Sequence, residues 1–141
     1  NNCPQGILFL PSDQPLITKT SLQLLCLLFI YYNSSHFACN NADKSSNANN
    51  NYSNNNHSNN NNNNNSNKKI CRLAFNENAG APVIFPACYY NELLTLPQGK
   101  GGGFIAKKHP AQVVLVPAQD EYELYDIDTP DDLIRLSRYL R

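Results

Sequence analysis

The stretch GILFLPSDQPLI, residues 6–17, decides how the fold of this chain is interpreted. Its continuous apolar run, residues 7–10, predicts a central strand buried on both faces, although short runs of this kind also occur in helices. Pro11 cannot donate to a sheet and Pro15 restricts the residue before it to extended backbone, so the strand should stop near Asp13. Open α/β sheets bind ligands at the carboxyl ends of their strands, which makes Asp13 a candidate site residue. The alternative is an ordinary polar turn.

The composition limits the classes of protein that the chain can belong to. A length of 141 residues could hold one modest domain. There is no Met in the sequence, so we expect it to be a piece of a longer protein. The net charge is zero and no basic stripe is visible, which argues against a nucleic-acid partner or an anionic membrane surface.

The cysteines and the apolar stretches indicate a cytoplasmic protein. The cysteines are odd in number and lack CxxC spacing, which favours free thiols in a reducing compartment over a zinc site; they are Cys3, Cys26, Cys39, Cys71 and Cys88. Residues 22–32 are apolar except for Gln23, but they are too few to span a bilayer, and no basic region precedes them as in a signal peptide.

The segment that follows the first strand predicts a buried helix. Thr18 or Thr20 can cap it, because a hydroxyl there accepts from the unpaired amides of the first turn. Residues 22–32 are apolar nearly all round the helix. We therefore expect this helix to be buried, in its own domain or against other parts of the protein.

Residues 33–69 form an Asn- and Ser-rich insertion that we expect to be disordered, because it has too few apolar side chains to offset the entropy of ordering. We favour a passive spacer; the alternative is a prion-like association element. The insertion divides the expected nucleotide-binding fold into residues 1–32 and 70–141. None of the three histidines, His36, His57 and His109, has partners at metal-ligand spacing.

Order is expected to return at Ile70. ICRLAF predicts a strand, NENAGAP a turn and VIF a second short strand, followed by a helical pattern over residues 86–96. The glycine-rich run of residues 99–103 leads to one or two helical turns, and residues 113–116 predict a buried strand. The alternation of strands and helices indicates a layered α/β domain.

The last helix has complete start signals. Thr129 is the expected N-cap, Pro130 occupies the first helical position, and Asp131 and Asp132 suit the positive end of the helix dipole. The predicted buried stripe is Leu133, Ile134, Leu136 and Leu140.

Two acidic corners carry the predicted chemistry. One is SDQP after the first strand, and the other is DID, residues 126–128, before the last helix. Capping cannot explain both Asp126 and Asp128, because Thr129 already fills that role. Two carboxylates brought together from separate loops suit Mg²⁺, which usually keeps several waters and substrate phosphates. The run of residues 99–103 could present amides to an anion, or it could be a flexible connection.

Four blocks in order, LPSDQPLIT, GAPVIFP, GKGGGFIAKKHP and DIDTPDDL, resemble the carboxyl-terminal half of the MobA-like NTP transferases, and most of all the molybdenum cofactor cytidylyltransferase branch. The resemblance covers nearly everything outside the Asn-rich insertion. It implies a Rossmann-like three-layer α/β/α sandwich of the nucleotidyltransferase, glycosyltransferase-A-like kind, with a mixed, mostly parallel sheet that is incomplete at the N-terminus. It also implies transfer of a nucleotidyl group to molybdopterin with release of pyrophosphate.

The resemblance assigns roles to particular residues. Asp13 and Asp128 would be the catalytic acids and the Mg²⁺ ligands, and Gly80 and Pro82 would lie in the strand that borders the acceptor pocket. The DID sequence favours CTP over GTP as the nucleotide. The family's loop of pattern LAAGxSxRMGxxK is expected upstream of Asn1, so we expect this chain alone to be inactive.

The chain also departs from the family pattern. Gln98, Gly99 and Gly103 stand where the family has Gly-Asp and a later Arg. Two alternatives therefore stay open: a non-catalytic descendant or Asn-rich interaction protein that keeps the fold, and a transferase that acts on a sugar phosphate or another phosphorylated metabolite.

Overall fold

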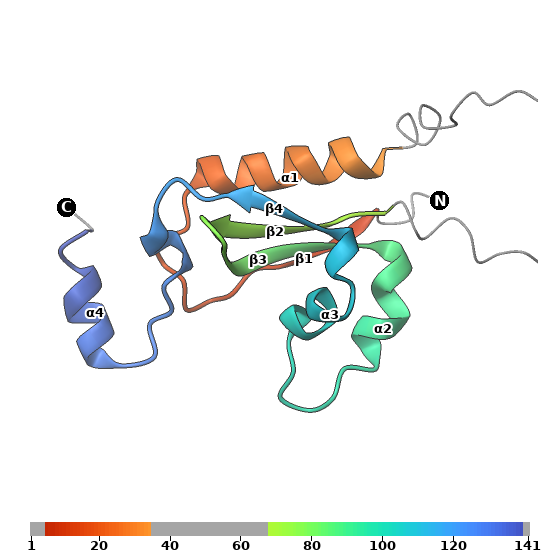
Figure 1. Cartoon of the computed structure of the whole chain (residues 1–141). Coiled ribbons are helices and arrows are strands. Elements are labelled where there is room, and N and C mark those ends of the chain that lie inside the picture. The colour runs from red at the N-terminus through yellow and green to blue at the C-terminus, as the bar shows by residue number, and fades with distance from the viewer. Residues whose placement is uncertain (1–4, 35–67, 140–141) are drawn as a thin grey trace, which may run out of the picture.

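The computed structural model describes residues 5–34 and 68–139. They form a four-stranded sheet of order β1–β3–β2–β4 with helices on both sides (Figure 1). The strands are β1 (Gly6–Phe9), β2 (Ile70–Phe75), β3 (Asn78–Pro86) and β4 (Val113–Pro117). The chain is therefore of the α/β class, as the sequence predicts.

The sheet is mixed, but the prediction that it is mostly parallel is wrong for the described strands. β1 and β2 both pair antiparallel with β3, and only β2 and β4 run parallel. The cause for β2 and β3 is a tight hairpin in which Phe75 pairs with Asn78, so that only Asn76 and Glu77 form the turn. Asn76 has a φ of 54°, a left-handed conformation that Asn tolerates well. A two-residue turn permits only antiparallel pairing.

Helices lie against both faces of the sheet. On one face α1 (Lys19–Asn33) covers a cluster that includes Leu25, Phe29, Cys71 and Leu73. On the other face α2 (Tyr90–Leu94) and α3 (Gly102–Lys108) cover a second cluster, built around Ile70, Val83, Phe85, Tyr89 and Ile105 (Figure 1). The short 3-10 turns are η2 (Ala87–Tyr89), η3 (Pro110–Gln112) and η4 (Glu121–Leu124).

β1 differs from the expected central, doubly buried strand. It lies at the edge of the described sheet, and Leu8 and Phe9 are 43% and 37% exposed. An edge strand packs on fewer neighbours than a central one, so its apolar run is only half covered. β1 also ends at Phe9, before Pro11, somewhat earlier than the sequence predicts.

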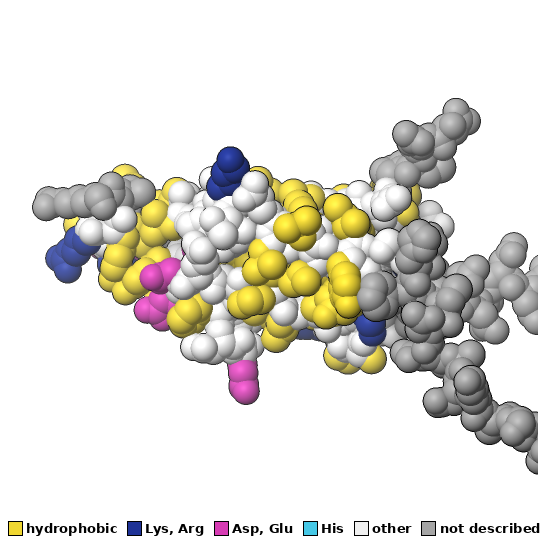
Figure 2. All heavy atoms as spheres, turned by 90° about the horizontal axis from the view of Figure 1, so that it is seen from above, with side chains coloured by type: hydrophobic (Ala, Val, Ile, Leu, Met, Phe, Trp, Pro, Cys, Tyr) yellow, Lys and Arg dark blue, Asp and Glu magenta, His cyan; other side chains and the backbone are white. Residues whose placement is uncertain are grey.

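α1 begins where the sequence predicts, with the Thr18 side chain accepting a hydrogen bond from the Ser21 N–H. Its buried residues recur every fourth position, at Ser21, Leu25, Phe29 and Asn33. The opposite side is exposed, with Leu27 at 64% and Ile30 at 54%. Figure 2 shows hydrophobic side chains gathered on this face of the molecule, over α1. Within the described residues, α1 is therefore buried on one side only, and not on all sides as expected. None of their helices is long and apolar enough to cross a membrane.

α4 (Pro130–Leu136) confirms the predicted helix start. Thr129 and Asp132 form a reciprocal capping box, and Pro130 occupies the first turn. The predicted buried stripe is largely wrong: Leu136 is 1% exposed, but Leu133 and Ile134 are 51% and 63% exposed. α4 lies to one side of the sheet rather than on it (Figure 1). Besides Leu136, this end of the chain is held by Arg135 over the Tyr125 ring and by Tyr139 stacked on Tyr122. Leu140 and the main part of the Asn-rich insertion lie outside the described residues.

Candidate functional site

The two acidic loops lie in direct contact. The Ile127 N–H donates to the Asp13 carbonyl oxygen at 2.8 Å, although more than a hundred residues separate them in the sequence. The Gln14 Nε2 donates to Asp126 Oδ1 at 2.7 Å and to the Leu124 carbonyl oxygen at 3.4 Å. Gln14 is buried, so the amide side chain fixes the two loops against each other. The juxtaposition expected from the sequence is therefore present at the level of the backbone.

The acids of these loops have different surroundings. Asp126 accepts the hydrogen bond from Gln14, so the role of Asp126 is structural. Asp13 and Asp128 are exposed, so their carboxylates are accessible to solvent and to a ligand. Asp132 is engaged at the helix start, where it accepts from the Thr129 N–H and from Arg135 Nη2. Asp131 is exposed on the same turn. These positions agree with the expectation that Asp131 and Asp132 belong to the helix start.

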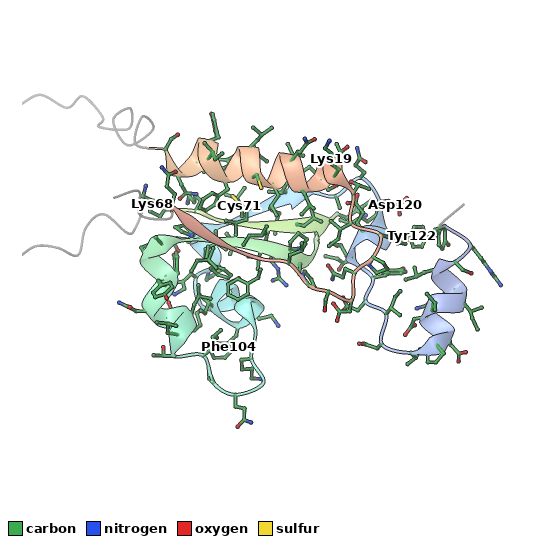
Figure 3. The ribbon with its side chains drawn as sticks, turned by 180° about the vertical axis from the view of Figure 1, so that it is seen from behind. Lys19, Lys68, Cys71, Phe104, Asp120 and Tyr122 are labelled. Carbon is green, nitrogen blue, oxygen red and sulfur yellow. The ribbon has the colours of Figure 1, made fainter. Side chains whose placement is uncertain are left out.

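Glu123 anchors the segment that leads into the second acidic loop. Its carboxylate is buried and accepts hydrogen bonds from the Thr18 N–H at 3.0 Å, Ser21 Oγ at 2.9 Å and the Gln119 N–H at 2.8 Å. Burial acts to raise the pKa of Glu123, but these hydrogen bonds outweigh it and hold the pKa below its ordinary value. Figure 3 shows this end of the molecule, where Lys19 of α1, Asp120 and Tyr122 are labelled. The sequence alone did not single out Glu123.

A cleft of about 340 Å³ lies beside the first acidic loop. It is lined by the end of β1, by parts of β2 and β3, and by the glycine run before and within α3; the residues are Phe9, Leu10, Pro11, Arg72, Gly80, Ala81, Val83, Gly101, Gly102 and Gly103. Parts of three of the four sequence blocks thus share one cleft. The fourth block touches the first through the hydrogen bond between Ile127 and Asp13.

Gly80 and Pro82, the two residues expected at an acceptor pocket, have different positions. Gly80 lines the cleft, and its carbonyl oxygen accepts from Arg72 Nε at 2.6 Å. A Cβ on Gly80 would lie 2.8 Å from Leu124 Cδ2, so any side chain there would force Leu124 of η4 to shift. Pro82 is fully buried and is not part of the cleft wall.

Arg72 is the cleft residue that the sequence analysis missed. It is a charged side chain in the middle of β2, whose other residues are apolar. Charged residues are rarely placed in a buried strand without a partner, and this was the available signal. Burial lowers the pKa of the Arg72 guanidinium.

The acidic loops offer oxygen atoms, the type of ligand that Mg²⁺ prefers. No group of three or more His, Cys, Asp or Glu side chains that could hold a metal is found in residues 5–34 and 68–139. A magnesium ion that keeps waters and substrate phosphates needs fewer protein ligands than that. The loops offer carboxylate oxygens, and Gln14 Oε1 is a buried oxygen with no hydrogen-bond partner in the described part of the chain.

His109 has partners of a structural kind. Its Nε2 lies 2.8 Å from Glu92 Oε2, and Lys108 Nζ lies 2.7 Å from Glu92 Oε1, so this carboxylate joins α2 to the end of α3. Of the cysteines that the structure describes, Cys26, Cys71 and Cys88 are free thiols. Cys71 is buried in the sheet, and burial raises its pKa to about 11, which leaves it an inert thiol at neutral pH.

Comparison with known proteins found no matching family model, no matching curated protein and no matching solved structure.

Proposed function

We propose that this chain is part of a Mg²⁺-dependent nucleotidyltransferase, with the Rossmann-like nucleotidyltransferase fold, that transfers a cytidylyl group from CTP to molybdopterin. The observation that carries the proposal is the hydrogen bond between the Ile127 N–H and the Asp13 carbonyl oxygen. It joins two loops that a transferase of this kind needs side by side. The resemblance of the four sequence blocks supplies the reaction and the substrates.

In the proposed reaction a phosphate oxygen of the acceptor attacks the α-phosphorus of the nucleoside triphosphate. A new phosphorus–oxygen bond forms, the bond to the β-phosphate breaks, and pyrophosphate leaves. Such transfers depend mainly on positioning and on electrostatic stabilisation of the phosphate charge. Asp13 and Asp128 would hold Mg²⁺, which supplies charge neutralisation to the triphosphate. Gln14 and Asp126 keep the two loops in place.

The test measures pyrophosphate release from CTP and molybdopterin against Mg²⁺ concentration, in a protein that carries this chain. Asp13→Asn and Asp128→Asn should each lower kcat by about a hundredfold or more, because the change removes the charge but keeps the shape. The double variant should be scarcely worse than either single one, since groups that share one ion do not act additively.

Asp131→Asn is the matched control, because Asp131 is an exposed acid near Asp128 that lies outside both acidic loops. Its turnover and Mg²⁺ dependence should match those of the wild type. Full turnover and an unchanged Mg²⁺ dependence in Asp128→Asn would overturn the metal assignment.

A further inference from the structure

The cleft beside the first acidic loop contains a cationic group with no acidic partner. Arg72 Nε donates to the Gly80 carbonyl oxygen, and no carboxylate lies among the residues that line the cleft. The ion pairs within the described ranges involve Lys108, His109 and Arg135, not Arg72. Its two Nη groups thus have no partner among the residues that the structure describes.

A half-buried guanidinium without a counter-ion favours an anionic ligand. Its charge is partly removed from water and so loses part of its stabilisation by solvent, and a bound anion would replace that stabilisation. The planar fork of a guanidinium matches two oxygens of a phosphate or carboxylate at once. With Nε engaged by Gly80, the Nη groups remain available for such an anion.

The glycines of the cleft leave room for a ligand next to this guanidinium. A Cβ on Gly103 would lie 3.5 Å from Arg72 Nη2, whereas a Cβ on Gly101 would meet nothing within 4 Å. Gly102 has another role, because its Cβ would lie 2.7 Å from Phe85 in the core. The backbone at Gly103 therefore lies against the guanidinium with no side chain to cover it.

The remaining walls of the cleft are apolar. Phe9 and Leu10 are both partly exposed, and Val83 lies on the neighbouring strand. A volume of about 340 Å³ falls at the lower end of the range of small-molecule sites. The cleft therefore suits a small molecule with one anionic group and a flat or weakly polar body.

We propose that Arg72 binds the phosphate group of the acceptor substrate in this cleft, and that Phe9 and Leu10 contact the body of the same molecule. That the bound phosphate belongs to the acceptor substrate rests on the proposed function. Leu10 and Pro11 precede Asp13 by only a few residues, so the cleft borders the loop of the proposed catalytic acids.

The test uses this chain and two probes, inorganic phosphate and phenyl phosphate. Binding is followed by NMR on the Arg72 Nε–Hε resonance and on the amides of residues 101–103. Phenyl phosphate should bind more tightly than inorganic phosphate, because only its ring can contact Phe9 and Leu10. Arg72→Gln should weaken phenyl phosphate binding at least about tenfold, and Arg138→Gln, which removes the same charge from an exposed site, should leave Kd unchanged.

Two alanine variants test the same site without removing the charge. Gly103→Ala should weaken binding about threefold or more, because its methyl group lies against Nη2 and covers part of the fork. Asn91→Ala, an exposed change on α2 outside the residues that line the cleft, should bind as the wild type does. Should Arg72→Gln fail to fold, this pair decides the question.

Wild-type affinity in a folded Arg72→Gln, or equal affinity in the two alanine variants, would overturn the proposal. The proposed function fails separately. Asp128→Asn should keep phenyl phosphate binding in this chain, and the longer protein that carries it should lose transfer. Binding that depends on Arg72, together with no transfer from CTP to molybdopterin in the longer wild-type protein, would overturn the function and leave the anion site in place.

Discussion

At the scale of single residues, the Glu123 carboxylate is an acceptor surrounded by donors. The Thr18 N–H and Oγ1, Ser21 Oγ and the Gln119 N–H all point at it. A carboxylate accepts all of these bonds, whereas an amide would turn an NH₂ group toward some of the donors. The charge of Glu123 is therefore required by its surroundings, even though the side chain is buried.

Glu123→Gln should lower the free energy of unfolding by about 1–3 kcal/mol at pH 7, because it leaves buried donors without an acceptor. Glu121→Gln, on the same turn but exposed, should change it by less than about 0.5 kcal/mol. Urea unfolding measures both. Equal stability of the two variants would show that the Glu123 network contributes little.

The same residue predicts a pH dependence. The pKa of Glu123 is lower in the folded protein than its ordinary value of 4.5, so the carboxylate stabilises the fold above that pH. The stability is lost as the pH falls through the pKa of the folded state. The difference in unfolding free energy between wild type and Glu123→Gln should therefore be largest near neutral pH and shrink below pH 4.5. A constant difference down to pH 3 would contradict this assignment.

The direction of the Arg72 side chain could not be predicted from the sequence. Its position in an apolar strand was visible, but whether its side chain faces α1 or the cleft depends on the register of β2 against β3 and β4. A bulge between Arg72 and Ala74 shifts that register. Register is a property of pairs of strands, so no local pattern could place the guanidinium in the cleft.

At the scale of elements, short sequence motifs correctly predicted the starts of helices. The capping box of α4 and the Thr18 cap of α1 were readable, because each involves residues three positions apart. The edge position of β1 and the exposed side of α1 were not, because both depend on which segments pack together. The acidic loops lie between these cases: the resemblance paired them, and the structure shows backbone contact.

α1 provides a test of its one-sided packing. Leu25→Ala should lower the free energy of unfolding by about 2–5 kcal/mol, because Leu25 is 0% exposed between α1 and the sheet. Leu27→Ala, two residues further on and 64% exposed, should change it by less than about 0.5 kcal/mol. Chemical denaturation of both variants gives the comparison. A large loss in Leu27→Ala would show that this side of the helix is covered in solution.

At the scale of the whole molecule, the end of α1 and the start of β2 lie side by side. The Asn33 side chain donates to the Lys69 carbonyl oxygen and accepts from the Lys69 N–H, at 3.0 and 2.9 Å. Lys68 Nζ donates to the Asn33 carbonyl oxygen at 2.8 Å. These bonds hold the two ends of the intervening segment together, and the segment itself lies outside the described residues.

Deletion of residues 40–67 should leave the fold intact and stabilise it by no more than about 1–2 kcal/mol, because a shorter loop costs less entropy to close. The residues that join the two ends would all be kept. Asn33→Ala in the intact chain should instead destabilise by about 1–3 kcal/mol, since it removes the buried side chain that joins them. Thermal and urea unfolding measure both, and a large loss of stability on deletion would show that the Asn-rich segment has a structural role.

Because Asn33 and Lys69 hold the end of α1 and the start of β2 together, a guest domain can be inserted between them. A guest domain whose own termini lie close together could replace residues 40–67 without pulling α1 away from β2, since both junctions are fixed by the host. A fluorescent protein grafted there would label the molecule from within the chain, leaving both chain termini unmodified.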